Sequence, residues 1–288
     1  MTVAIGPVGL WAPVRLWANA GTAAPDLAAE IEEAGFDALW LGNGPDVLAT
    51  LTGLVAATRR LPVATGVLNV TAHPPTEALA AWSELAGPDR DRVLLGLGGG
   101  WPAPYAGMSR YLDALDTAPL PVPAASRVLG ALGPKMLELA ARRGAGAHPF
   151  LVTPEHTRWA REILGYGPLL APEQKVVLER DPATARDIAR RALDFYLTKR
   201  NYAVTLLRLG FTEDDLAGGG SDRLVDALVA WGDVDAVVAR IHDHHLAGAD
   251  HVAVQPLTAD TDFIAPERRR LPVAQYRRLA EALTTLSR

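Results

Sequence analysis

The sequence predicts an α/β fold, a closed (β/α)8 TIM barrel, and three observations lead to it. Eight short runs rich in valine, leucine and isoleucine recur along the 288 residues, each followed by a segment with helical periodicity. Several runs, such as VLLGLG and HVAVQPL, are apolar throughout, which is typical of parallel strands that helices cover on both faces. Such a barrel commonly occupies about 250 residues as one domain. An open doubly wound sheet is the competing architecture.

The expected strands are short and buried. They cover Val3–Trp11, Phe36–Gly42, Pro62–Val70, Arg92–Gly98, Ser126–Leu132, Gly146–Val152, Gln174–Asp181 and His251–Leu257.

The expected helices carry recognisable end signals. Asp181 and Thr153 each precede a proline, so each places an N-cap side chain before a proline at the first helical position. Gly35, Gly144 and Gly248 stand where left-handed C-caps belong. The helices cover Ala23–Ala34, Asp46–Arg59, Pro75–Ala86, Pro134–Arg143, Pro154–Leu164, Pro182–Tyr196, Val234–Ala247 and Pro272–Leu286.

Two places depart from the regular pattern. The fourth unit is truncated, because only Tyr105–Asp116 can be helical before a proline-rich stretch. Residues 197–232 are more than one connection between neighbouring units needs, and they hold two helical pieces around Gly218, Gly219 and Gly220. We therefore expect an insertion after strand seven that shapes the substrate pocket. The whole chain, 1–288, is expected to form one domain.

Composition excludes several classes of protein. A net charge of −5 gives no overall attraction to nucleic acid or to anionic membranes. Without cysteine there are no disulfides, thiolate nucleophiles or cysteine-bound metals. The first residues make a poor signal peptide, and the longest uncharged stretch is too short for a membrane span. We therefore expect a soluble cytoplasmic protein that binds neither nucleic acid nor membrane.

In a barrel, function lies at the carboxyl ends of the strands, and here those ends are rich in glycine and amides. Gly98, Gly99, Gly100 and Trp101 follow the fourth strand, but their spacing departs from a dinucleotide fingerprint. They indicate either a close approach of backbone to a ligand or a flexible turn.

The segment Gly133–Pro134–Lys135 begins a helix with a cation in its first turn. A cation at this position interacts unfavourably with the helix dipole, at a cost of about 0.3–1 kcal/mol. An anion bound beside the cation would make the interaction favourable. The segment therefore indicates a phosphate or carboxylate site, with a solvated lysine as the alternative.

Other motifs carry less chemistry. The cluster His242–His245 resembles a metal site, but it lies far from the strand ends, and we interpret it as a solvated helix face. The run Arg268–Arg270 is too short for a nucleic-acid site. The sequence has no G-x-S-x-G elbow and no Walker loop. It therefore lacks the motifs that a serine hydrolase or a nucleotide hydrolase needs. No metal ligand set is assigned.

Several strings together resemble one family. PVATGVLNVTAHPP at Pro62–Pro75 and DRVLLGLGGG at Asp91–Gly100 resemble strands three and four of the bacterial luciferase-like superfamily, nearest to its branch dependent on the deazaflavin coenzyme F420. AGFDALWLG, ALGPKMLELAARRGAG and AGADHVAVQ fit the same branch. The resemblance covers nearly the whole chain.

The resemblance implies a barrel with a flat deazaflavin or flavin in its mouth, and it implies a homodimer. It places a non-proline cis peptide behind the ring at Gly66–Val67. It assigns Asn69 and His73 to the ring edge and cofactor tail, and it assigns Gly98–Trp101 and Gly133–Lys135 to the loops around the tail and its phosphate.

One departure from the family affects the chemistry. Many relatives carry a histidine at the end of strand two, where this chain has Asn43, and an amide cannot shuttle a proton near neutral pH. Asn43 and His73 are the catalytic candidates, with His148 as the other available imidazole. Trp11 and Tyr202 are candidates for the substrate side.

Three functions follow as hypotheses. The first is an oxidoreductase that transfers a hydride between F420 and a small organic substrate, because the cofactor supplies the chemistry and the protein holds it in a dry pocket. The second is an FMN-dependent monooxygenase on the same fold. The third is a barrel without catalysis that acts as a binding or structural subunit.

Overall fold

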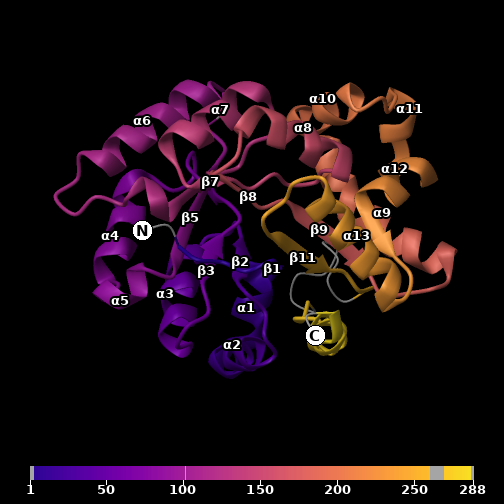
Figure 1. Cartoon of the computed structure of the whole chain (residues 1–288), viewed down its shortest axis with the longest axis horizontal. Coiled ribbons are helices and arrows are strands. Elements are labelled where there is room, and N and C mark those ends of the chain that lie inside the picture. Colours follow the sequence, from indigo (N-terminus) through magenta and orange to yellow (C-terminus); the bar gives the residue numbers. More distant parts are fainter. Residues whose placement is uncertain (1–2, 101, 260–268, 287–288) are drawn as a thin grey trace.

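The structure is a computed structural model that describes residues 3–100, 102–259 and 269–286, with side chains to Leu283 in the last helix. A curled sheet lies at the centre and helices surround it (Figure 1). Every strand pairing among the described residues is parallel, as expected for β/α units. The strands are β1 (Val8–Pro13), β2 (Leu39–Gly42), β3 (Val63–Thr65), β4 (Leu68–Asn69), β5 (Val93–Gly98), β6 (Arg127–Leu129), β7 (Gly146–Ala147), β8 (Leu169–Leu170), β9 (Glu173–Val177), β10 (Val229–Trp231) and β11 (Val252–Pro256).

The curled sheet returns to its starting strand, which confirms the barrel and excludes the open alternative. From β1 the pairing runs through β2, β3, β5, β6 and β7 to β8. Two residues after β8 the same segment becomes β9, which pairs with β11, and β11 pairs with β1. The amide of Asp250, just before β11, also donates to the carbonyl of Leu170 in β8. Each of the eight expected strands therefore has a counterpart in the ring, with β3 and β4, and β8 and β9, as two parts of one strand.

The expected helices are present with small shifts at their ends. Thr153 accepts a hydrogen bond from the amide of His156, and Asp181 accepts one from Thr184, so both expected N-caps are confirmed. The helices of the regular units are α1 (Val14–Ala20), α2 (Ala24–Glu33), α3 (Val47–Ala57), α4 (Pro75–Glu84), α5 (Gly87–Arg90), α6 (Pro104–Asp116), α7 (Pro134–Arg143), α8 (Pro154–Leu164), α9 (Pro182–Leu197), α13 (Val234–Leu246) and α14 (Val273–Leu286).

Two sequence interpretations are wrong. Gly35 and Gly248 are left-handed as expected, but Gly144 has φ −142°, which is extended backbone. A Cβ on Gly144 would lie 2.9 Å from the carbonyl oxygen of Arg127, so this glycine allows close packing on β6. His244 does not belong to a solvated face, because it is fully buried between the Thr157 hydroxyl and the Gln174 amide.

The segment between α9 and α13 contains three α-helices, where the sequence predicted two helical pieces, together with one strand that the sequence did not predict. Its helices are α10 (Arg200–Arg208), α11 (Glu213–Leu216) and α12 (Asp222–Leu228), and β10 follows them and pairs with β9. These helices lie beyond α9, at one side of the molecule (Figure 1). Leu206, Leu224 and Val225 join a separate apolar cluster with α9.

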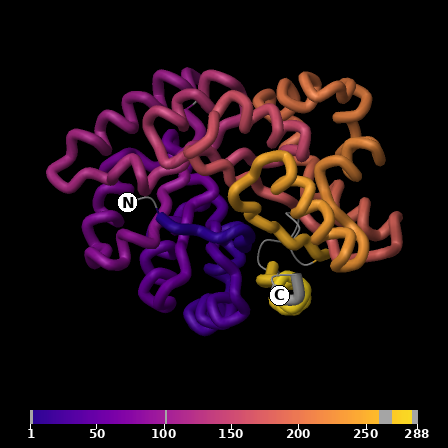
Figure 2. The backbone as a smooth tube through the Cα atoms, in the orientation of Figure 1, coloured from indigo at the N-terminus to yellow at the C-terminus, as the bar shows by residue number. Residues whose placement is uncertain are grey.

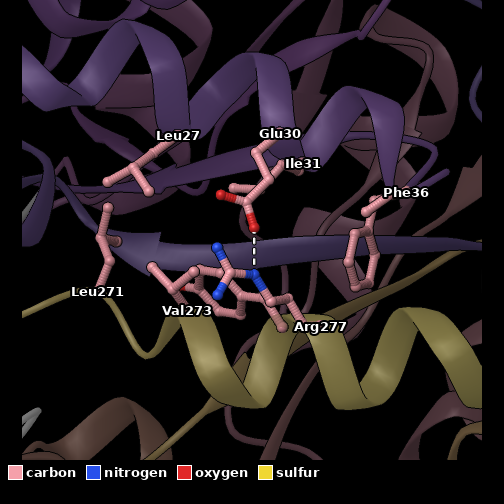
Figure 3. A pocket seen from close by; sticks show the side chains of 9 residues that line it. Leu27, Glu30, Ile31, Phe36, Leu271, Val273 and Arg277 are labelled. Carbon is pink, nitrogen blue, oxygen red and sulfur yellow. Dashed lines mark hydrogen bonds and ion pairs between the residues drawn. The ribbon is translucent and has the colours of Figure 1, made fainter.

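The last helix of the chain lies beside an early one, since α14 packs against α2 (Figure 2). Arg277 of α14 donates to the carboxylate of Glu30, and apolar side chains flank this pair (Figure 3). Burial of these apolar side chains stabilises the contact more than the exposed ion pair does.

No helix in the described part of the chain combines the length and the apolar character that crossing a bilayer requires.

Candidate functional site

A cavity of about 500 Å³ opens at the carboxyl ends of the barrel strands, where the sequence predicted the site. Its floor comes from β1 and from the bulge between β3 and β4, and one wall comes from α9 and the start of α10. No carboxylate lines this cavity among the described residues, and Lys199 is the single charged side chain in that lining.

The floor is a backbone surface that tolerates only small residues. The Gly66–Val67 peptide bond is cis, as the family resemblance implies. The indole nitrogen of Trp11 donates to the carbonyl oxygen of Gly66 at 2.9 Å. A Cβ on Gly66 would lie 2.6 Å from that nitrogen, and a Cβ on Gly98 would lie 2.3 Å from a methyl group of Val67. Glycine is therefore required at both positions.

Amide groups and a threonine join the loops at the rim. The backbone amide of Asn69 donates to the Asn43 side chain at 3.1 Å, and the Asn69 side chain accepts from the amide of Thr71 at 2.9 Å. The Thr71 hydroxyl then accepts from the amide of Gly100 at 3.1 Å. These bonds hold the loops after β2, β4 and β5 together and leave neutral polar groups beside the cavity.

Aromatic side chains form the wall opposite the rim amides. Phe150 has its ring centroid 5.3 Å from Trp11, 5.1 Å from Tyr196 and 6.2 Å from Tyr202. Phe195 lies 5.5 Å from Tyr196. All five rings line the cavity, so its wall is apolar and suits a flat ligand.

His148 belongs to the lining of the cavity, next to Gly66, and is a neutral imidazole. Its Nδ1–H donates to the carbonyl of Ala171 at 2.7 Å, and its ring stacks on Trp40 at 4.3 Å. Burial lowers the pKa of His148 to about 3. Its Nε2, which has no partner among the described residues, is a hydrogen-bond acceptor close to Gly66. This imidazole is therefore not a proton shuttle near neutral pH.

A buried ion pair supports the aromatic wall. Lys175 Nζ lies 3.0 Å from Glu173 Oε1 and 3.8 Å from the ring centroid of Phe150, and both charged side chains are 1% exposed. Glu173 also accepts from the amide of Leu151, whose φ of 60° is in the left-handed region. Burial raises the pKa of Glu173 and lowers that of Lys175, while the attraction between them opposes both shifts.

The structure brings together part of the predicted set. The members that line the cavity are Trp11, Asn43, Gly66, Val67, Asn69, Gly98, Gly99 and Tyr202, together with His148, the other candidate imidazole.

The remaining predicted residues do not line the cavity. His73 is buried against Glu77 of α4, with its Nδ1 2.9 Å from the carboxylate. Gly100 lies outside the lining, and its amide is linked to the rim by a hydrogen bond to the Thr71 hydroxyl. Gly133, Pro134 and Lys135 begin α7 outside the lining, and Trp101 falls outside the described residues. The roles assigned to these residues stay predictions.

Sequence reasoning missed most of the wall and the charges behind it. Phe195 and Tyr196 continue the helical pattern of α9, and Lys199 lies in the short turn after it, so nothing in the sequence marked them as cavity residues. The string EQKVV does place Glu173 and Lys175 on the same face of a buried strand. Two opposite charges two residues apart in a buried strand could have predicted this ion pair from the sequence.

The sequence and the fold were compared with known proteins. A family model matches residues 7–109, from β1 into α6, and its description is "Luciferase-like monooxygenase". The resemblance to the luciferase-like family is thus confirmed. No curated protein matches the sequence significantly.

Solved structures with a similar fold cover nearly the whole chain. An F420-dependent secondary alcohol dehydrogenase in complex with an F420–acetone adduct aligns with a TM-score of 0.70 at 13% identity, covering 92% of this chain and 100% of that one. The coenzyme F420-dependent tetrahydromethanopterin reductase from Methanopyrus kandleri also scores 0.70, at 16% identity, covering 88% and 93%. The oxygenating constituent of 3,6-diketocamphane monooxygenase from Pseudomonas putida, in complex with FMN, scores 0.61 at 14% identity and covers 96% of both chains. At these identities the likeness shows the fold.

Proposed function

We propose that this protein is an oxidoreductase that binds coenzyme F420 in the cavity and transfers a hydride between it and a small organic substrate. The observation that carries the proposal is the cavity itself: glycine backbone as floor, neutral amides at the rim and aromatic rings as wall. Similarity in fold to two F420-dependent enzymes supports the choice of cofactor.

The residues present fit a planar ring. The close approach of backbone at Gly66 and Gly98 leaves no room for side chains at these two positions, so a flat ring can lie on the floor with the aromatic wall facing the space above it. Asn43 and Asn69 carry amides, which can both donate to and accept from the polar edge of a tricyclic ring. Bound there, the deazaflavin would supply the carbon that gives or takes the hydride.

The protein's own contribution is positioning and exclusion of water. The hydrogen bond from Trp11 to Gly66 fixes the floor, and the aromatic wall removes water from the space above it. The cavity lining that the structure describes has no carboxylate, and His148 is held neutral. The site therefore suits hydride transfer better than a reaction that needs a strong general acid.

Direct titration of the purified chain with F420 and with FMN tests the proposal. We expect saturable binding of F420, followed by its fluorescence, and much weaker binding of FMN. Leu132 lines the cavity, so Leu132→Trp should fill the site and abolish binding. Leu120, which is 39% exposed and outside the cavity lining, provides the matched control Leu120→Trp.

The same titration separates the competing functions. Tight binding of FMN with negligible binding of F420 would replace the proposal with the FMN-dependent monooxygenase. Binding of neither cofactor, with the fold intact by circular dichroism, would favour a barrel that serves as a binding or structural subunit. The proposed homodimer is tested separately by light scattering.

A further inference from the structure

We infer that the substrate is a flat apolar molecule with one anionic group, most simply an aromatic carboxylate. Its body would lie on the aromatic wall, and Lys199 would bind the anion. This inference rests on the proposed function only in taking the cavity as the substrate site.

The first support is the shape and chemistry of the wall. Tyr196 and Tyr202 meet edge to face, with centroids 5.6 Å apart and planes at 87°. Phe150 lies beside both of them. Together they form an apolar corner, and a planar hydrocarbon body can pack on it by stacking or edge contacts.

The second support is the position of Lys199. It is the N-cap residue of α10, it lines the cavity, and its Nζ lies 4.1 Å from the ring centroid of Phe195. Within the described chain it makes no ion pair, whereas most arginines near the insertion are paired with aspartates. Its ammonium therefore stands beside an aromatic surface with its charge available to a ligand.

The third support is that the wall disfavours a cation. The face of Phe150 already receives the Lys175 ammonium at 3.8 Å, and Tyr196 lies 5.2 Å from the same nitrogen. A cationic ligand would compete with Lys175 for these rings and would find no carboxylate in the described lining. Lys199 is exposed at the edge of the cavity, so a neutral ligand would gain no ion pair from it. An anion satisfies both conditions.

Matched probes measure the charge preference. We would determine the dissociation constants of 2-naphthoate, 2-naphthamide and 2-naphthylmethylamine by calorimetry, with the full chain and no cofactor. The expected order is naphthoate, then the amide, then the amine. An exposed ion pair contributes up to about 1 kcal/mol, so we expect the carboxylate to bind more tightly than the amide by a factor of up to about five.

Substitutions assign that preference to named residues. Lys199→Met should remove the difference between carboxylate and amide while leaving amide affinity unchanged, and Lys199→Arg should restore it. Arg200 is exposed and outside the cavity lining, so Arg200→Met should change nothing. Tyr202→Leu should weaken all three probes by a similar factor, and Tyr166→Leu, at a side chain 94% exposed, should weaken none.

Several results would overturn the inference. Equal binding of the carboxylate and the amide would remove the anionic group from the substrate class. A preference that survives Lys199→Met would remove Lys199 from the role. If added F420 or FMN displaced naphthoate competitively, Lys199 would be binding the cofactor phosphate and the assignment to substrate would fail. Charge-selective probe binding without cofactor binding would instead contradict only the proposed function.

Discussion

At the scale of single residues, the buried pair Glu173–Lys175 is the most unusual feature of the site. A buried ion pair costs desolvation energy and often contributes little net stability, so its presence beneath a cavity calls for a positional explanation. Here Lys175 contacts the face of Phe150, and Glu173 holds the amide of the left-handed residue Leu151. The pair thus fixes the turn that presents Phe150 to the cavity.

This leads to a prediction about stability. Glu173→Gln should lower the free energy of unfolding by about 3–5 kcal/mol, because it leaves the Lys175 ammonium buried without its partner. The double variant Glu173→Gln with Lys175→Met should recover most of that loss, since no charge is then buried. Urea denaturation of the single and double variants measures both values. A double variant no more stable than Glu173→Gln would contradict the explanation.

At the scale of elements, β5 and the bulge between β3 and β4 approach so closely that glycine becomes a structural requirement. A Cβ on Gly98 would lie 2.3 Å from Val67, whereas a Cβ on Gly53, in the exposed face of α3, would meet nothing within 4 Å. The two glycines therefore differ in what an added methyl group must displace.

A matched pair of alanine substitutions tests that difference. Gly98→Ala should destabilise the protein by about 1–3 kcal/mol through overpacking, and it should weaken cofactor binding because the floor must move. Gly53→Ala should stabilise by about 0.5–1 kcal/mol through helix propensity, with cofactor affinity unchanged. Thermal unfolding and cofactor titration of both variants provide the readouts. Unchanged cofactor affinity in Gly98→Ala would show that the floor does not contact the ring.

At the scale of the whole molecule, three buried histidines connect distant parts of the barrel in their neutral form. His148 donates to Ala171, His244 lies between Thr157 and Gln174, and His251 accepts from the Trp40 indole at 3.0 Å. Burial lowers their pKa values to about 3, 3 and 4, from an ordinary value of 6.5.

These pKa shifts predict a loss of stability in mild acid. Below pH 6.5 the unfolded chain binds protons that the native imidazoles do not, so the free energy of unfolding falls as pH falls from about 6.5 towards 4. These three groups contribute at most about 4 kcal/mol per pH unit, and His156, whose pKa burial also lowers, adds to the slope. Denaturant unfolding between pH 7 and 5 measures it. His244→Asn should reduce the slope by up to about 1.4 kcal/mol per pH unit, and an unchanged slope would mean that His244 is not among its causes.

The sequence by itself determined the order of strands and helices, because hydrophobic periodicity, N-cap residues before prolines and glycines after helices are local signals. It also placed the glycine and amide parts of the site, since strand ends in a parallel barrel meet at one face whatever the sequence distance. The tertiary structure decided the rest. Four features depend on contacts between segments far apart in the chain or on which helix face is covered. They are the closure of the ring, the burial of His244, the assembly of Phe195, Tyr196 and Lys199 at the cavity, and the pairing of Glu173 with Lys175. No local pattern encodes those contacts, because burial is a property of the packed molecule.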